Sequence, residues 1–144
     1  MFDSILVVCT GNICRSPIGE RFLRKHLAGK RVDSAGTGAL VSHEADPSAV
    51  NIASQHGISL DGHMGQQFTS SLARQYDLIL VMEKHHIDQI GRIAPEARGK
   101  AMLFGHWLNR EIPDPYRKSD EAFASVYKLI EQAGQLWVEK LRDK

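Results

Sequence analysis

Residues 5–17 read Ile5-Leu6-Val7-Val8-Cys9-Thr10-Gly11-Asn12-Ile13-Cys14-Arg15-Ser16-Pro17. The first four form an apolar run rich in β-branched side chains, which is typical of a strand buried on both faces. The next part, Thr10-Gly11-Asn12, favours a turn. Ser16 and Pro17 then predict a helix start, with Ser16 as N-cap and Pro17 at the first helical position. A loop around a helix N-terminus directs backbone N–H groups at one point, so this unit predicts a phosphate site.

Three side chains of this unit have the chemistry for attack of sulfur on phosphorus. Cys9 ends the strand, and the helix terminus together with Arg15 favours its thiolate form. The planar fork of Arg15 can hold two phosphoryl oxygens, which a lysine cannot do. The Ser16 hydroxyl can donate to the Cys9 sulfur and steady it as a leaving group. We therefore predict a nucleophile, an anion cradle and a bidentate guanidinium in one loop.

A simpler interpretation is that Cys9 is only a small buried residue and Arg15 only a surface charge. Most free cysteines in proteins are of this buried, non-functional kind. The pattern Cys-x5-Arg followed by Ser or Thr arises by chance in roughly one chain in a hundred at average composition. A preceding strand, an internal glycine and a following Ser-Pro helix start make it rarer. This context favours the phosphate-binding interpretation.

Length and composition exclude several classes of protein. The chain has 144 residues, 42% of them hydrophobic, a net charge of +1 and two cysteines. We expect a single domain, residues 1–144. The near-neutral net charge lacks the basic excess that is typical of nucleic-acid-binding proteins. Two cysteines are too few for a disulfide framework and suggest a reducing compartment. Neither a signal-peptide pattern nor an apolar stretch near the ~20 residues of a bilayer span is present. We expect a cytoplasmic protein with no nucleic-acid partner and no stable membrane insertion.

Strand and helix patterns alternate along the rest of the chain. We expect strands at residues 5–8, 31–35, 78–82 and 101–104, and helices at residues 17–27, 47–56, 69–74, 85–93 and 120–141. This alternation predicts an α/β fold: a single three-layer domain with a four-stranded parallel sheet flanked by helices. Ligands bind such sheets beyond the carboxyl ends of the strands. Cys9 ends the first strand and Asp114 follows the last, so both should open on the same edge.

Asp114 lies in Ile112-Pro113-Asp114-Pro115-Tyr116, which on its own is ordinary turn chemistry. Its pairing with Cys-x5-Arg makes it a candidate general acid, because cleavage of a phosphate ester needs a proton for the leaving oxygen. The same carboxylate could then activate water against the cysteinyl phosphate.

The stretch from Val8 to Pro17 resembles the phosphate-binding loop of the low-molecular-weight protein tyrosine phosphatases, and Asp114-Pro115-Tyr116 resembles that family's general-acid loop. Ser34-Ala35-Gly36-Thr37 and Asp46-Pro47 also match the family pattern, and the likeness covers essentially the whole chain. The resemblance implies a flavodoxin-like strand order and hydrolysis of phosphotyrosine through a cysteinyl phosphate, with no cofactor. It implies catalytic roles for Cys9, Arg15 and Asp114. The implied phosphate-binding residues are Thr10, Gly11, Asn12, Ile13, Cys14 and Arg15.

Further roles follow from the same resemblance. Asn12, otherwise a common turn residue, matches the position that holds the loop in shape through side-chain hydrogen bonds. Leu40 and Tyr116 match positions that flank the substrate ring; Tyr116 can stack on a phenyl ring, whereas Leu40 could also be a scattered surface residue. Residues 102–107 and 112–119 resemble the bacterial branch that works with exopolysaccharide tyrosine autokinases. The implied partner is therefore a phosphotyrosine protein, namely such an autokinase.

The residues argue against three rival functions. Arsenate reductases use a similar fold and loop, but they need additional cysteines, and none follows Cys14. A non-catalytic phosphotyrosine-binding module need not keep both a nucleophile and an acid. Dual-specificity phosphatases usually have a histidine before the cysteine, where this chain has Val8.

The remaining cysteine and the histidines give two further expectations. Cys14 lies five residues from Cys9 in the same loop, so a reversible Cys9–Cys14 bond could protect Cys9 from over-oxidation. The seven histidines show no metal-ligand grouping. His85 and His86 are adjacent and would point in different directions on a helix, so we expect no metal site.

Overall fold

The computed structural model describes residues 2–142 of the chain. Its four strands are all parallel and lie in the order β2-β1-β3-β4. They are β1 (Ser4–Cys9), β2 (Arg31–Gly36), β3 (Leu78–Val81) and β4 (Ala101–Leu103). This confirms the predicted fold class and the flavodoxin-like order. The chain runs outward from β1 to β2 and then crosses back to β3, which makes β1 and β3 the topological switch point.

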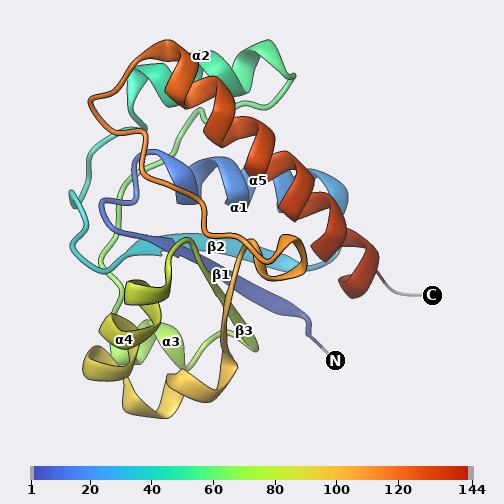
Figure 1. Ribbon diagram of the computed structural model, residues 1–144. Coiled ribbons are helices and arrows are strands. Elements are labelled where there is room, and N and C mark those ends of the chain that lie inside the picture. Colours follow the sequence, from blue (N-terminus) through green and yellow to red (C-terminus); the bar gives the residue numbers. More distant parts are fainter. Residues whose placement is uncertain (1, 143–144) are drawn as a thin grey trace.

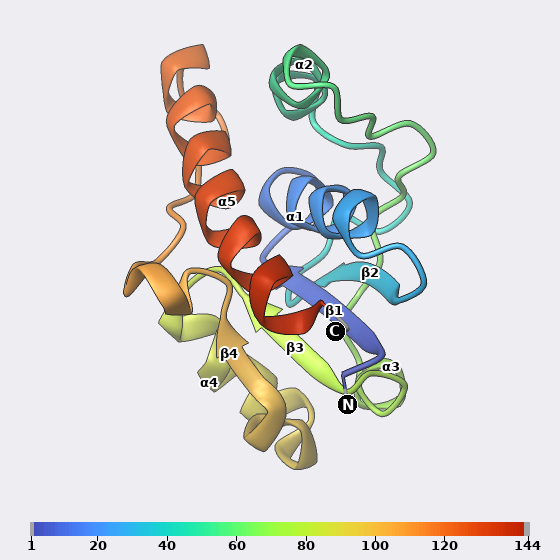
Figure 2. The ribbon, with the colours of Figure 1, turned by 90° about the vertical axis from the view of Figure 1, so that its right-hand side faces the viewer.

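Helices cover both faces of the sheet (Figures 1 and 2). One face carries α1 (Arg15–His26), α2 (Pro47–Gln55) and α5 (Asp120–Leu141), and the other carries α3 (Ser70–Ala73) and α4 (Lys84–Ile93). Two short 3-10 turns, η1 (Pro95–Lys100) and η2 (His106–Leu108), flank β4. In the described part of the chain, none of these helices has the length and apolar character needed to cross a membrane.

Strand β1 divides its side chains between two cores. Ile5 and Val7 pack on the side of α1 and α5, whereas Leu6 and Val8 pack on the side of α3 and α4. All four are fully buried. Both faces of the strand are covered, which explains why its sequence is continuously apolar instead of alternating.

Helices α1 and α5 approach closely because α5 carries a glycine where they meet. A Cβ atom at Gly134 would lie only 2.6 Å from Cδ1 of Phe22 on α1. By helix propensity alone Gly134 is a weak position. The close packing of Phe22 against this position explains why a glycine stands there.

The start of α1 differs from the prediction. The helix begins at Arg15 with Cys14 at the N-cap position, so Ser16 is inside the helix and does not cap it. The Ser16 hydroxyl is instead occupied by Asn12 and Cys9. Helix α2 begins at Pro47 as predicted, and the side chain of Asp46 caps it. At α3, Thr69 is the N-cap and not the first helical residue.

Candidate active site

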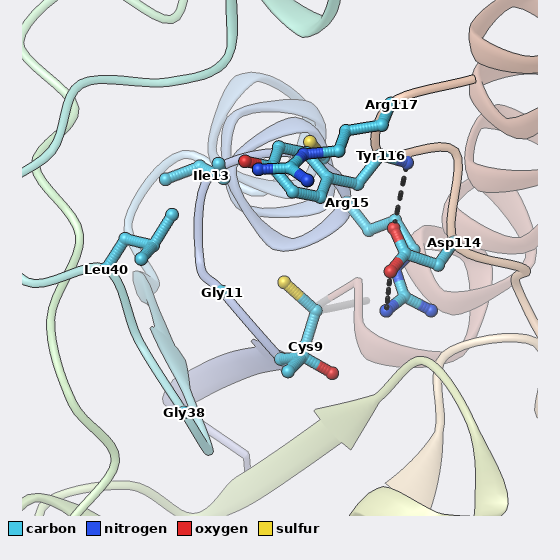
Figure 3. Close-up of a pocket in the computed structure, with 11 residues that line it drawn as sticks. Cys9, Gly11, Ile13, Arg15, Gly38, Leu40, Asp114, Tyr116 and Arg117 are labelled. Carbon is cyan, nitrogen blue, oxygen red and sulfur yellow. Dashed lines mark hydrogen bonds and ion pairs between the residues drawn. The ribbon is translucent and has the colours of Figure 1, made fainter.

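A pocket of about 340 Å³ opens where β1 ends (Figure 3). It is lined by Cys9, Thr10, Gly11, Ile13, Cys14, Arg15, Gly38, Leu40, Asp114, Tyr116 and Arg117. The predicted nucleophile, arginine, acid and both ring-contact residues therefore meet in one place. Asn12 and Ser16 lie behind the loop and not on the lining. Gly38 and Arg117 line the pocket although the sequence analysis gave them no role.

The loop between β1 and α1 is held from outside through its carbonyl groups. The carbonyls of five consecutive residues accept hydrogen bonds: Cys9 from the amide of Thr37, Thr10 from Gly38, Gly11 from Leu40, Asn12 from the His63 ring, and Ile13 from the amide of Asp46. In a trans peptide the C=O and the following N–H point in opposite directions. These contacts therefore turn the next N–H groups inward, and with the N-terminus of α1 they form a cradle for an anion.

Two glycines make these close approaches possible. A Cβ atom at Gly36 would lie 2.3 Å from the carbonyl oxygen of Thr10, and one at Gly65 would lie 2.3 Å from the carbonyl oxygen of Leu40. A side chain at either position would push a neighbouring loop away from the pocket. Gly36 belongs to the Ser34–Thr37 stretch that the resemblance singled out, which gives this motif a steric reason.

Asn12 braces the loop from behind. It has a φ of 60° and is fully buried, in a left-handed conformation that asparagine tolerates better than most residues. Its side-chain amide donates to the hydroxyls of Ser16 (2.8 Å) and Ser34 (3.0 Å), and its Oδ1 accepts from the amide of Gln66 (2.9 Å). This geometry suits a residue that holds the shape of the loop, whereas its side chain does not reach the pocket lining.

The same network connects to the contact between Ser16 and Cys9. The Ser16 oxygen accepts from Asn12, so its own proton is available for the Cys9 sulfur 2.9 Å away. Ser34 is arranged alike: it accepts from Asn12 and donates to the buried carboxylate of Glu20 at 2.9 Å. A hydroxyl that donates to sulfur stabilises the thiolate over the thiol.

Arg15 is buried, and one of its guanidinium nitrogens uses both of its N–H groups in hydrogen bonds. Its Nη1 donates to the carboxylate of Glu83 (2.6 Å) and to the carbonyl of Ile112 (2.8 Å). Burial by itself would raise the pKa of Glu83, but the hydrogen bond to Arg15 and its charge outweigh burial and lower that pKa. Within residues 2–142 the Nε–Nη2 edge of Arg15 makes no hydrogen bond, so this edge is left for two oxygens of an anion.

Asp114 lies at the mouth of the pocket, half exposed. One carboxylate oxygen accepts from the amide of Tyr116 at 3.0 Å, and the other lies 3.9 Å from Nη2 of Arg15. Figure 3 shows both contacts as dashed lines. The guanidinium of Arg117 lies over the Tyr116 ring, 5.3 Å from its centroid. A carboxyl group in this position has access both to solvent and to a group bound above Cys9.

The histidines are less scattered than the sequence suggested. Ligand atoms of Glu83, His85 and His86 lie within 4.8 Å of one another, a grouping that the sequence analysis overlooked because Glu83 precedes the helix. The prediction that the two rings point in different directions is wrong, because the centroids of the His85 and His86 rings lie 4.2 Å apart, although His86 is buried and His85 exposed. Glu83 is bonded to Arg15, and both ring nitrogens of His86 have partners. A metal ion would have to displace these contacts.

Two of the supporting residues that the sequence analysis missed share one signal. Glu83 and His86 follow closely after the buried strand β3, whereas His63 lies in the long segment between β2 and β3 and carries no such signal. Polar residues just beyond the carboxyl end of a buried strand face the ligand edge of a parallel sheet. Burial lowers the pKa of His63, although its bond to the Asn12 carbonyl, 2.6 Å, works against this.

Comparisons with known proteins agree with this geometry. The sequence matches the family described as low molecular weight phosphotyrosine protein phosphatase over residues 4–144. It is 70% identical over 143 residues to a putative low molecular weight protein-tyrosine-phosphatase of Klebsiella pneumoniae, covering 99% of each chain. It is 61% identical over 141 residues to the low molecular weight protein-tyrosine-phosphatase Etp of Escherichia coli K12, covering 97% of this chain and 95% of Etp.

A solved structure gives the same result for the fold. The tyrosine phosphatase Wzb from Escherichia coli K30, crystallised in complex with sulphate, superimposes with a TM-score of 0.97 at 68% sequence identity. The match covers 98% of this chain and 99% of that one.

Proposed function

The chain belongs to the low molecular weight protein-tyrosine phosphatases, and from this premise we propose that it hydrolyses phosphotyrosine through a cysteinyl phosphate on Cys9, in a protein substrate that is a bacterial tyrosine autokinase. One observation carries the mechanism: a hydroxyl whose proton is free for sulfur lies 2.9 Å from a cysteine at the bottom of an anion cradle. Arg15 and Asp114 lie in the same pocket. A pocket that only bound phosphotyrosine would need neither the thiolate nor the acid.

The first step transfers the phosphoryl group to sulfur. The loop N–H groups and the Nε–Nη2 edge of Arg15 bind the phosphoryl oxygens, and the Cys9 thiolate attacks phosphorus from below. As the S–P bond forms, the bond from phosphorus to the tyrosyl oxygen breaks. Asp114, in its protonated form, gives its proton to that oxygen, so that a neutral phenol leaves.

The second step returns the enzyme to its starting state. The Asp114 carboxylate takes a proton from a water molecule, whose oxygen attacks phosphorus. The S–P bond breaks, and the Cys9 sulfur leaves as a thiolate that the Ser16 hydroxyl stabilises. Inorganic phosphate is released and Asp114 is protonated again, so no cofactor is consumed.

The walls of the pocket suit an aromatic leaving group. Leu40 and Tyr116 face it from two different loops and are each more than a third exposed. An aromatic ring seated above Cys9 would contact an aliphatic side chain on one side and an aromatic one on the other. The resemblance of residues 102–107 and 112–119 to the exopolysaccharide-associated branch supports a tyrosine autokinase as the protein that carries this ring.

The mechanism is tested by Cys9→Ser, which we expect to keep the fold and lose turnover, because a serine hydroxyl is far harder to ionise than a thiol. Wild-type protein should hydrolyse p-nitrophenyl phosphate in the presence of a metal chelator, vanadate should inhibit it, and acid quenching should trap phosphate on Cys9. Cys14→Ser is the matched control and should keep most of the activity. A Cys9→Ser protein with a tenth of wild-type activity would exclude Cys9 as the nucleophile.

The substrate is tested separately. We expect the wild-type protein to release phosphate from a purified, autophosphorylated bacterial tyrosine autokinase much faster than from a protein phosphorylated on serine. Equal rates on the two proteins, or no release from the autokinase while p-nitrophenyl phosphate is still hydrolysed, would reject the autokinase and leave the phosphatase mechanism intact.

A further inference from the structure

The phosphate-binding loop has a second support, on the side of the sheet away from α1. Thr10, the residue after Cys9, forms a hydrogen bond from its Oγ1 to Nε2 of His86 at 2.9 Å. His86 lies in the first turn of α4 and is fully buried. The Asn12 network and the His86 contact therefore hold the loop from opposite faces.

The surroundings of His86 determine which ring nitrogen carries the proton. Nδ1 lies 3.1 Å from the backbone amide of Glu83, which can only donate. A neutral ring that accepts at Nδ1 must be protonated at Nε2. His86 therefore donates to the Thr10 oxygen, and Thr10 is the acceptor.

The same turn also holds the other end of the loop. Glu83, whose amide bonds to His86, has its carboxylate on Arg15 at 2.6 Å. The turn from Glu83 to His86 thus contacts both the first residue after the nucleophile and the arginine at the end of the loop.

We propose that His86 is a positioning residue for the reaction: by donating to Thr10 it holds the beginning of the phosphate-binding loop in the conformation that binds the transferring phosphoryl group. This inference rests on the proposed function, since it assigns the support of that same site. Among residues 2–142, His86 is the one partner that forms a hydrogen bond with the Thr10 side chain.

The charged groups around His86 keep this contact in place under ordinary conditions. Burial first, and then the charges of Arg15 on α1 and His85 on α4, lower the pKa of His86 to about 4, while Glu83 and Asp114 act in the opposite direction. The ring is thus neutral near neutral pH. Protonation would put an N–H at Nδ1 against the N–H of Glu83, and two donors cannot share that contact.

The test uses Thr10→Val, which keeps the shape of the side chain and removes the acceptor, together with His86→Phe and the double variant. Thr10→Ser keeps the hydroxyl and serves as the conservative variant. Thr37→Val is the matched control, because the Thr37 hydroxyl also bonds to α4, at Gln89 (2.7 Å), but lies outside the pocket. The measurements are kcat/KM on p-nitrophenyl phosphate, inhibition by vanadate, and the midpoint of unfolding in denaturant.

We expect Thr10→Val to lose roughly 10- to 100-fold in kcat/KM and to bind vanadate correspondingly less tightly, since small displacements of a catalytic group cost this much. Thr10→Ser and Thr37→Val should stay within about threefold of wild type. The double variant should be no slower than the worse single variant, because both changes remove the same Thr10–His86 hydrogen bond, and His86→Phe alone already removes the bond from the Glu83 amide. It should also be more stable than the sum of the single losses predicts, since neither partner of the Thr10–His86 hydrogen bond is left unpaired, although the Glu83 amide loses its acceptor in both His86 variants; it should nevertheless remain slow.

Wild-type activity in Thr10→Val, or losses that multiply in the double variant, would overturn the inference. Should the double variant not fold, the comparison of Thr10→Val with Thr37→Val still decides. If the proposed function itself were wrong, the wild-type protein would form no phosphate adduct on Cys9, an outcome that is separate from any effect of these variants.

Discussion

The two cysteines share one loop, but their surroundings give them different chemistry. Burial, together with the negative charges of Asp46 and Cys9, raises the pKa of the Cys14 thiol, so Cys14 remains protonated near neutral pH. Cys9 has the Ser16 hydroxyl on its sulfur. This difference supports Cys9 and not Cys14 as the proposed nucleophile, with Cys14 as a neutral thiol beside it.

This difference predicts the redox behaviour. Mild peroxide should oxidise Cys9 to a sulfenic acid; the Cys14 sulfur then attacks it, water leaves, and a Cys9–Cys14 disulfide forms. Activity should be lost, and dithiothreitol should restore it. Mass spectrometry should show the loss of two hydrogens, and the disulfide should form faster at higher pH because Cys14 must lose its proton.

Cys14→Ser is the control for this prediction, and it should be inactivated irreversibly by the same treatment. A wild-type protein that carries only sulfinic or sulfonic acid on Cys9 after oxidation would show that Cys14 gives no protection.

A substitution of Asp114 tests the proposed proton transfer to the leaving group separately from the attack by Cys9. Asp114→Asn should slow phosphorylation of Cys9 more with phosphotyrosine than with p-nitrophenyl phosphate. The phenol of tyrosine has a pKa of about 10 and needs the proton, whereas p-nitrophenol leaves more easily. General-acid assistance is typically worth about 10²–10⁴-fold, so rapid-quench kinetics should resolve the gap.

The step must be measured before turnover, since the proposed mechanism also uses Asp114 as base in the second step. Equal losses on the two substrates in the phosphorylation step would mean that another group protonates the leaving oxygen.

At the level of elements, α1 differs from other helices in how it starts. The helices α2, α3 and α5 are capped by the side chains of Asp46, Thr69 and Ser119, respectively. Helix α1 has no side-chain cap. The first N–H groups of a helix need an acceptor, and at α1 a bound phosphoryl group can supply it. The serine that the sequence suggested as a cap serves the Cys9 sulfur instead.

The crossing of α1 and α5 gives a prediction about stability. Gly134→Ala should lower the free energy of unfolding by roughly 1–3 kcal/mol, the usual cost of overpacking, because the new methyl group would overlap the Phe22 ring. This opposes helix propensity, which favours alanine over glycine by about 1 kcal/mol. Denaturant unfolding measures the change.

Gly91→Ala is the matched control in another helix. A Cβ there meets only the flexible Arg98 side chain, at 3.4 Å, so this variant should be as stable as wild type or more so. A Gly134→Ala protein that gains stability like Gly91→Ala would contradict the close packing of α1 against α5.

For the molecule as a whole, buried neutral histidines couple stability to pH. The pKa of His86 is lowered to about 4 and that of His63 is also lowered, both chiefly by burial. The unfolded chain takes up these protons below about pH 6.5, whereas the folded protein does not, so this part of the stability is complete above pH 6.5 and is lost as the pH falls toward the folded pKa. Between pH 7 and 5 we expect His86 to account for on the order of 1–2 kcal/mol.

The measurement is denaturant unfolding at several pH values for wild type, His86→Gln and His85→Gln. His86→Gln should show a shallower loss of stability toward pH 5, and His85→Gln, at an exposed position, should follow the wild type. Parallel curves for wild type and His86→Gln would show that His86 is protonated in the folded protein as readily as in the unfolded one.

Much of the fold and the pocket could be predicted because the relevant signals are local. Strand β1 is buried on both faces, so its consecutive residues are all apolar and the strand can be recognised from the sequence. The Cys-x5-Arg spacing spans a single loop, and the Asp-Pro-Tyr segment follows the last strand of a parallel sheet, whose carboxyl edge is shared. These features needed no knowledge of distant contacts.

What the sequence by itself determined is therefore the order of strands and helices, the loop with its cysteine and arginine, and the acid that faces them. Only the tertiary structure decided which groups hold that loop: Glu83 on Arg15, His86 on Thr10, His63 and Gln66 on Asn12. It also decided that the Ser16 hydroxyl contacts the Cys9 sulfur instead of capping α1, and that position 134 must be a glycine to leave room for the Phe22 ring. Such contacts join residues far apart in the chain, and their identity depends on distances and directions that no local spacing encodes.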